Sequence, residues 1–193
     1  MIRDAWANLT PTDSNGNEDD ANDRAEIRKA QLVDLFHRCR SLIKIVRKSQ
    51  ILTAYLDLQR TKLGLSRRLA LDCRTRWNST YVSLSTLLDH KQAMSNLFAN
   101  KRQLILPAKQ KEILAGLELS SDDWAIVSHV IQILDPFYQA TQLLSGSKYP
   151  TIGLCLFAIQ NIREFLEADA DDQASIVANL KGFLLDSFNQ YFK

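Results

Sequence analysis

Residues 121–146 read SDDWAIVSHVIQILDPFYQATQLLSG. Apolar side chains recur in this stretch every three or four residues along two adjacent stripes, which is typical of a helix that is apolar over most of its circumference. We expect this helix to lie centrally in the fold. Ser120 or Ser121 can cap its start, the acidic pair Asp122–Asp123 suits its first turn, and Pro136 is expected to kink or break it.

The same helical spacing runs through most of the chain on either side. Helices are predicted from about Ala25 to Val46, Ile51 to Thr61, Trp77 to Ala99, Pro107 to Gly116, Pro150 to Leu166 and Ile176 to Tyr191. Leu69–Cys73 is the only run for which a β-strand is as good an interpretation as a helix. With six Gly and four Pro, the sequence lacks the frequent turns of an all-β fold. The predicted fold class is mainly α, a helical bundle of six or seven helices with at most one or two short strands.

Several classes of protein are excluded by what the sequence lacks. No stretch approaches 18 uninterrupted apolar residues and the first twenty residues do not resemble a signal peptide, so we expect a soluble intracellular protein with no membrane partner. Cys39, Cys73 and Cys155 are far apart and form neither a disulfide framework nor a zinc pattern. Phosphate-binding loops and nucleophile or metalloprotease motifs are missing too. We therefore expect no metal, no cofactor and no small-molecule enzyme.

Charge is strongly segregated along the chain, although the net charge is only +2. Residues 26–76 carry thirteen basic and four acidic side chains, whereas residues 117–193 carry four and ten. Residues 1–25 are polar and acidic, so we expect a disordered lead-in there. The basic segment is either a nucleic-acid contact or the solvated face of helices, and charge alone favours the second interpretation somewhat. Arg40, Lys44 and Arg47 lie on the polar side of its first helix.

Four arginines and a tryptophan surround the strand-like run: Arg67, Arg68, Arg74, Arg76 and Trp77. Arginines beside an exposed aromatic ring can clamp phosphates and stack on an unpaired base. Alternatively, Trp77 begins an apolar stripe of a core helix and the arginines are solvated, which is the interpretation that composition alone favours. Asp72 closes the strand-like run, where a lone carboxylate is more often a cap or an ion-pair partner than a metal ligand.

The segment LALDCRTRWNSTYVSLSTLL, residues 69–88, resembles the L-x-L-D-x-x-T-R-W-N-S-T-Y segment of hAT-superfamily transposases and their domesticated BED-zinc-finger relatives. Three further pieces resemble the family in the same order: LIKIVRKSQILTAYL at 42–56, Trp124 with ILDPFYQATQLLSGSKYPT at 133–151, and SFNQYF at 187–192. The resemblance covers about residues 27–193. Each piece alone is weak, but their combination is specific.

In this family a helical insertion interrupts an RNase H-like core that carries an Asp-Asp-Glu metal site. The resemblance implies that residues 26–76 hold basic helices and the last strand of the core, and that residues 77–193 form the insertion. Arg76 and Trp77 match the family's Arg-Trp pair, whose tryptophan is implicated in handling an unstacked base. The resemblance also implies that the catalytic carboxylates fall outside this chain, so Asp72 is not one of them.

The predicted function is therefore that of a transposase-derived, catalytically incomplete, DNA-associated protein, located in the nucleus by family resemblance. The predicted DNA-binding residues are Arg40, Lys44, Arg47, Arg74, Arg76 and Trp77. The alternative is a protein-interaction or dimerisation module without DNA binding, and a degenerate relic remains a third interpretation. As a slice of a larger fold, the chain is expected to leave Leu69–Cys73 and the apolar face of the 32–46 helix uncovered, and so to self-associate.

Overall fold

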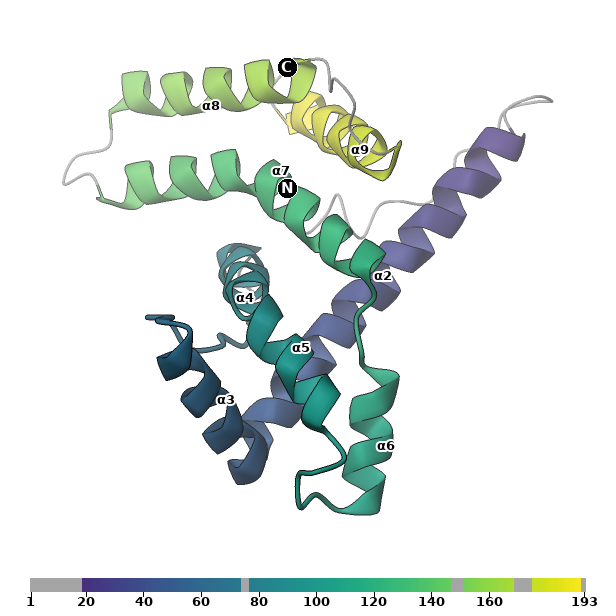
Figure 1. Cartoon of the computed structure of the whole chain (residues 1–193). Helices are drawn as coiled ribbons and strands as arrows, with labels where there is room; N and C mark the ends of the chain where they lie inside the picture. The colour runs from purple at the N-terminus through teal and green to yellow at the C-terminus, as the bar shows by residue number, and fades with distance from the viewer. Residues whose placement is uncertain (1–18, 74–76, 147–150, 169–174, 192–193) are drawn as a thin grey trace. The chain divides into compact units, whose positions relative to one another are not determined.

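The computed structural model describes residues 19–73, 77–146, 151–168 and 175–191, and these form helices joined by connecting segments (Figure 1). The helices are α2 (Asp19–Lys48), α3 (Gln50–Lys62), α4 (Trp77–Asp89), α5 (Lys91–Asn100), α6 (Ala108–Gly116), α7 (Ser121–Gly146), α8 (Ile152–Glu167) and α9 (Ser175–Tyr191). The described residues contain no strand. The predicted fold class, mainly α, is confirmed.

The first helix, α2, begins at Asp19 and not near Ala25. The last residues of the predicted disordered lead-in are therefore helical, and residues 1–18 lie outside the described part of the chain.

The described residues fall into two compact units. The central unit comprises Gln31–Ser128, and the C-terminal unit comprises His129–Lys193 with the described residues before Gln31. The expected domain boundary after Arg76 falls inside the central unit. One link across this position is the hydrogen bond that the Tyr55 hydroxyl of α3 donates to the backbone carbonyl of Asn96 in α5, at 3.1 Å.

The apolar face of α2 is buried, contrary to the expectation that it would lack a partner. Its side chains are buried throughout: Leu32, Leu35, Cys39, Leu42, Ile43 and Val46. The described residues contain no sheet, yet this face is buried, and helices later in the chain carry further buried side chains. Buried side chains of these helices include Leu87, Met94, Leu97, Leu114 and Val127.

The strand predicted at Leu69–Cys73 is wrong. The segment is an extended connection between α3 and α4, and side chains satisfy its backbone. The amide of Ala70 donates to Thr86 Oγ1 at 3.0 Å, and the amide of Cys73 donates to Ser79 Oγ at 2.7 Å. A β-type composition becomes a strand only when another strand can pair with it, and here hydroxyl groups of α4 take that place.

The single helix predicted over residues 77–99 is two helices, so the described residues hold eight helices where seven were predicted. α4 ends at Asp89 and α5 begins at Lys91, with buried His90 between them. His90 Nδ1 lies 2.7 Å from the carbonyl oxygen of Thr86, and since a carbonyl only accepts, Nδ1 carries the proton. This buried hydrogen bond stabilises the turn between α4 and α5.

α7 starts where the sequence predicts. The amide of Asp123 donates to Ser120 Oγ at 3.1 Å, and the amide of Ser120 donates to Asp123 Oδ2 at 2.8 Å, a reciprocal capping box. The helix continues through Pro136 without a break. Six of its apolar side chains are buried: Trp124, Val127, Val130, Ile133, Leu134 and Phe137.

The C-terminal unit includes α8 and α9. Thr151 caps α8 by accepting from the amide of Leu154 at 3.2 Å, while the predicted helix start at Pro150 lies outside the described residues. The buried side chains of these two helices are Ala158, Ile162, Leu166, Leu180, Lys181, Leu184 and Phe188. The Lys181 ammonium lies 4.4 Å from the centroid of the Phe165 ring. In the part of the chain that the structure describes, no helix is long and apolar enough to cross a membrane.

Candidate nucleic-acid interface

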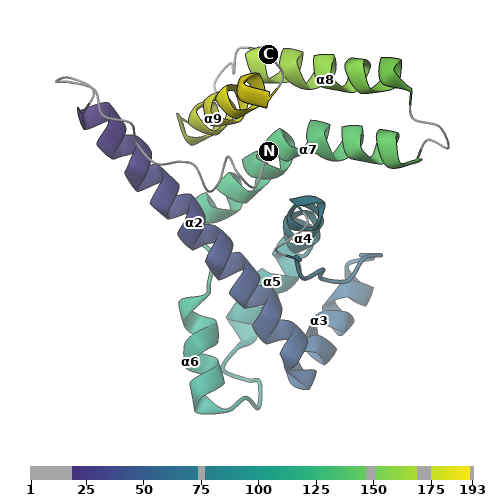
Figure 2. The ribbon, with the colours of Figure 1, turned by 180° about the vertical axis from the view of Figure 1, so that it is seen from behind.

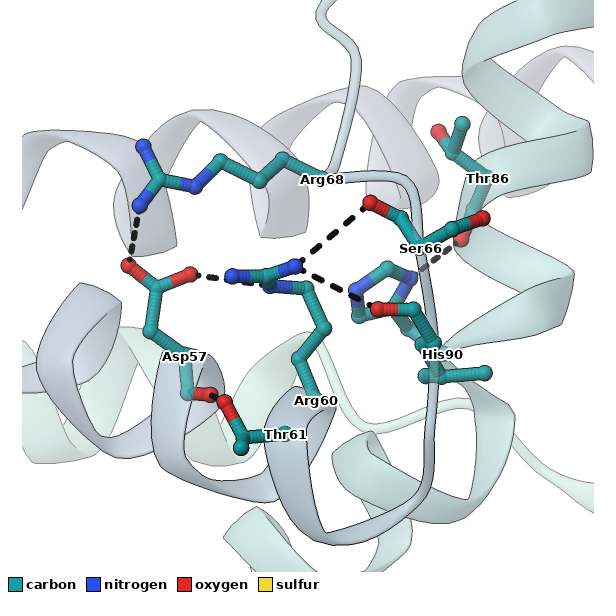
Figure 3. Close-up of polar contacts among 8 residues, drawn as sticks. Asp57, Arg60, Thr61, Ser66, Arg68, Thr86 and His90 are labelled. Atoms are coloured by element: carbon teal, nitrogen blue, oxygen red, sulfur yellow. Dashed lines mark hydrogen bonds and ion pairs between the residues drawn. The ribbon is translucent and has the colours of Figure 1, made fainter.

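The connection between α3 and α4, residues 63–73, is held on three sides, and we call it the arginine loop. It leaves α3 at Gly64, whose φ of 68° lies in the left-handed region that glycine adopts readily. Arg60 donates from Nη1 to the carbonyl oxygens of Leu65 and Ser66 at 3.3 and 3.5 Å. Figure 3 shows Asp57 between Arg60 and Arg68, and it accepts from them at 3.2 and 3.0 Å. This network fixes the first half of the loop to α3.

The second anchor is α4. Arg67 donates to Asp89 Oδ2 at 2.7 Å and to Ser85 Oγ at 3.3 Å. Thr86, which accepts from the backbone of the loop, donates its own proton to the carbonyl of Ser83 at 3.0 Å. Arg67 and Arg68 are largely exposed, so each ion pair is worth little by itself. Together with the backbone hydrogen bonds they define the path of the loop.

The third anchor is an ion pair between Arg40 of α2 and Asp72 near the end of the loop. The Arg40 Nε donates to Asp72 Oδ1 at 2.7 Å, and Nη2 donates to Asp72 Oδ2. The Asp72 side chain is only 4% exposed, whereas that of Arg40 is 32% exposed. The hydrogen bonds that Arg40 donates to the Asp72 carboxylate raise the pKa of the Arg40 guanidinium. Asp72 is therefore an ion-pair partner, as its isolation in the sequence predicts.

A second ion pair joins distant parts of the central unit. Arg38 of α2 donates from Nη1 and Nη2 to the two carboxylate oxygens of Asp123, at 2.9 and 2.8 Å. These hydrogen bonds and those from Ser120 lower the pKa of Asp123 to about 2. The capping role predicted for Asp123 is confirmed, and the pairing with Arg38, 85 residues away, is an addition. Nowhere in the described residues do three His, Cys, Asp or Glu side chains gather in a way that could hold a metal ion.

Two of the predicted DNA-binding residues, Lys44 and Arg47, lie exposed at the C-terminal end of α2. Lys48 is exposed beside them and was missed, although it shares their side of the helix at the i, i+4 spacing. We call these three residues the α2 cationic ridge. Among the described residues, no carboxylate forms an ion pair with any of them, in contrast to the arginines of the loop.

The remaining predicted site residues follow the arginine loop directly. Arg74 and Arg76 lie outside the described residues, and so does the side chain of Trp77, whose backbone begins α4. The structure separates Arg40 from the group, because its guanidinium is engaged with Asp72. Of the six predicted residues, only Lys44 and Arg47 are described as exposed side chains with no ion-pair partner among the described residues.

The part of the chain that holds the α2 cationic ridge and the arginine loop is similar to known proteins. The family model for the ZBED1 RNase-like helical domain matches residues 27–133, which include the α2 cationic ridge and the arginine loop. The "Putative AC transposase" of Zea mays is 25% identical over 131 residues, 68% of this chain and 15% of that protein. The "Putative AC9 transposase" of Zea mays is 25% identical over 148 residues, 68% of this chain and 17% of that protein.

A third relative carries a different printed name. "Zinc finger BED domain-containing protein RICESLEEPER 2" of Oryza sativa subsp. japonica is 22% identical over 167 residues, 85% of this chain and 22% of that protein. The chain thus spans less than a quarter of the length of these three relatives.

Proposed function

The chain belongs to the family of the ZBED1 RNase-like helical domain, a transposase-related helical domain of the hAT family, and from this premise we propose that it associates with DNA through the α2 cationic ridge. The proposal concerns this chain, whereas its relatives named as transposases are several times longer. It includes a nuclear location and a domesticated role without transposition.

The observation that carries the proposal is the contrast between two sets of cations. Arg38, Arg40, Arg60, Arg67 and Arg68 are all engaged with carboxylates, so much of their charge is neutralised locally. Lys44, Arg47 and Lys48 have no such partner in the described part of the chain. Exposed cations of this kind gain affinity for DNA by releasing counterions from its phosphates.

The arginine loop has a positioning role in this proposal. It is tied to α2, α3 and α4, and the next residues along the chain are Arg74, Arg76 and Trp77. We propose that Arg74 and Arg76 contact phosphates and that Trp77 stacks on an unpaired base.

We further propose that this chain does not cleave or join DNA. Supporting this, Asp57, Asp72, Asp89 and Asp123 are all engaged by arginines and are not arranged to hold two metal ions. The test is incubation of the purified chain with supercoiled DNA and magnesium or manganese. No nicking is expected, and nicking that disappears in Asp72→Ala would overturn this part of the proposal.

The α2 cationic ridge is tested by charge removal. Lys44→Ala and Arg47→Ala should each weaken binding to any duplex and reduce the slope of log K against log salt by about 0.9. Lys62→Ala is the matched control, because it also removes one positive charge. Lys62 lies at the C-terminal end of α3, ~18 Å along the helix from Gln50, the residue of α3 nearest the ridge in the sequence. A control that loses as much affinity as the ridge variants would refute the assignment of the ridge.

A second candidate function is a protein-interaction or dimerisation module. Three large apolar side chains of α8, Ile152, Leu156 and Phe157, are exposed. Self-association through this face predicts a concentration-dependent sedimentation coefficient that Leu156→Lys abolishes. Salt-dependent DNA binding separates the two functions, because this second function predicts none.

A further inference from the structure

Ile105 is the most exposed large apolar side chain in the described part of the chain, at 88%. It lies in the connection between α5 and α6, at the apex of a three-residue turn in which the amide of Leu106 donates to the carbonyl of Leu104 at 2.9 Å. Leu106 is buried and Leu104 is half-buried, so the residues on either side anchor the turn. Pro107 then leads directly into α6 with a φ of −56°. The isoleucine therefore protrudes from a well-anchored support.

Cationic residues precede and follow Ile105 in the sequence. Arg102 and Lys109 are exposed and form no ion pair with a described residue. Lys111 donates from Nζ to the carbonyl of Arg102 at 3.4 Å, which links α6 to the start of the turn. Lys101 is different, because its ammonium pairs with Glu118 at 2.7 Å. Arg102 and Lys109 thus lie three residues before and four residues after Ile105 in the sequence, and we call these three residues the Ile105 tip.

We infer that the Ile105 tip is a second DNA contact, in which Ile105 inserts between base pairs from the minor groove while Arg102 and Lys109 bind the flanking phosphates. This inference rests on the proposed function and adds a deformation of the DNA to it. Proteins that bend DNA from the minor groove use an apolar side chain as a wedge and cations to hold the backbone. Figures 1 and 2 show the connection from α5 to α6 and the C-terminal end of α2 at the same end of the central unit.

An exposed apolar side chain with nearby cations could also bind an anionic lipid surface, but this ligand fits the Ile105 tip less well. Binding at a membrane interface grows with the apolar area that enters it, and Ile105 is a single side chain. Insertion into DNA needs only one side chain, because the gain comes from the bent duplex and the phosphates that it brings within reach. The observations therefore favour duplex DNA as the ligand.

The test uses the whole chain and a duplex with a central TA step, which is easily unstacked. Ile105→Ala should weaken binding about tenfold, near the lower end of what burying one isoleucine is worth. It should also abolish a bend of roughly 20–90° measured by energy transfer between dyes at the duplex ends. Ile27→Ala, at an isoleucine of α2 that is 58% exposed, is the matched control and should change neither. Unchanged melting midpoints establish that both variants fold.

Failure of this inference can be told apart from failure of the proposed function. If the parent chain binds and the ridge variants weaken it, but Ile105→Ala leaves affinity and bend unchanged, the Ile105 tip is refuted and the ridge stands. If the parent chain binds no duplex, both are refuted. Binding to vesicles of phosphatidylcholine and phosphatidylserine that Ile105→Ala abolishes, with no effect on DNA, would identify a lipid contact and also refute the inference.

Discussion

Arg40 and Asp72, 32 residues apart, are joined by two hydrogen bonds that tie α2 to the arginine loop just before Arg74 and Arg76. The carboxylate is almost fully buried, whereas the guanidinium is about one-third exposed. Asp72 therefore depends on Arg40 far more than Arg40 depends on Asp72. An arginine that resembles its neighbours Lys44 and Arg47 in the sequence thus has a different role in the structure.

Removing Arg40 should destabilise the fold. Arg40→Ala leaves the Asp72 carboxylate buried without its partner, and we expect a loss of about 1–3 kcal/mol, less than for a fully buried pair because Arg40 is partly exposed. Urea unfolding followed by circular dichroism measures it. Arg47→Ala is the control and should change stability by less than about 0.5 kcal/mol. Equal losses in the two variants would contradict the assigned roles.

The pairing of Arg38 with Asp123 predicts a dependence of stability on pH. Because the pKa of Asp123 is lowered to about 2 in the folded state, its contribution is present above the unfolded pKa of about 4 and is lost as the pH falls toward 2. Asp123→Asn should flatten the fall in melting midpoint over this window. Asp122→Asn, at the exposed neighbouring carboxylate, should not. If both variants behave like the parent chain, the ion pair contributes nothing.

The cysteines should differ in reactivity. Burial raises the pKa of the Cys39 thiol to about 12, so almost no thiolate is present at neutral pH, whereas Cys73 is exposed. Treatment of the native chain with iodoacetamide, followed by peptide mass analysis, should label Cys73 first and Cys39 only after unfolding. Cys73→Ser should remove the fast phase. Early labelling of Cys39 in the native chain would mean that α2 does not pack as described.

Trp77 provides a test of base stacking. In the proposed function, Trp77→Ala costs about 1–3 kcal/mol of affinity for single-stranded DNA and leaves the salt slope unchanged. A core tryptophan would instead lose about 3–5 kcal/mol of folding stability. Trp124→Ala, at a buried tryptophan, calibrates the second outcome. Measuring the free energy of unfolding and the DNA affinity of Trp77→Ala together shows whether Trp77 stacks on a base or belongs to the core.

Local features of this fold were predictable because they depend on residues close in sequence. The helical period predicted the helices, and the cap of α7 was narrowed to Ser120 or Ser121 from the acidic pair that follows. The separation of α4 from α5 was not predictable, because it depends on burying the polar ring of His90 at one junction. Leu69–Cys73 was misjudged because strand formation depends on a partner elsewhere in the chain.

The candidate site was predictable only in part, and for a related reason. Arg40, Lys44 and Arg47 look equivalent on the polar face of one helix. Their difference arises from Asp72, which only the folded chain brings to Arg40. Sequence spacing locates a cationic face, but it does not reveal which of its charges are neutralised.

The central claim is tested most directly by the salt dependence of DNA binding by the unmodified chain. Affinity for a fluorescent duplex should fall linearly in log K against log salt, with a slope of about −3 if the three cations of the α2 cationic ridge each bind one phosphate, and a steeper slope if the Ile105 tip and the arginines after the loop also engage. No binding at low salt, or binding that salt does not weaken, would contradict the claim.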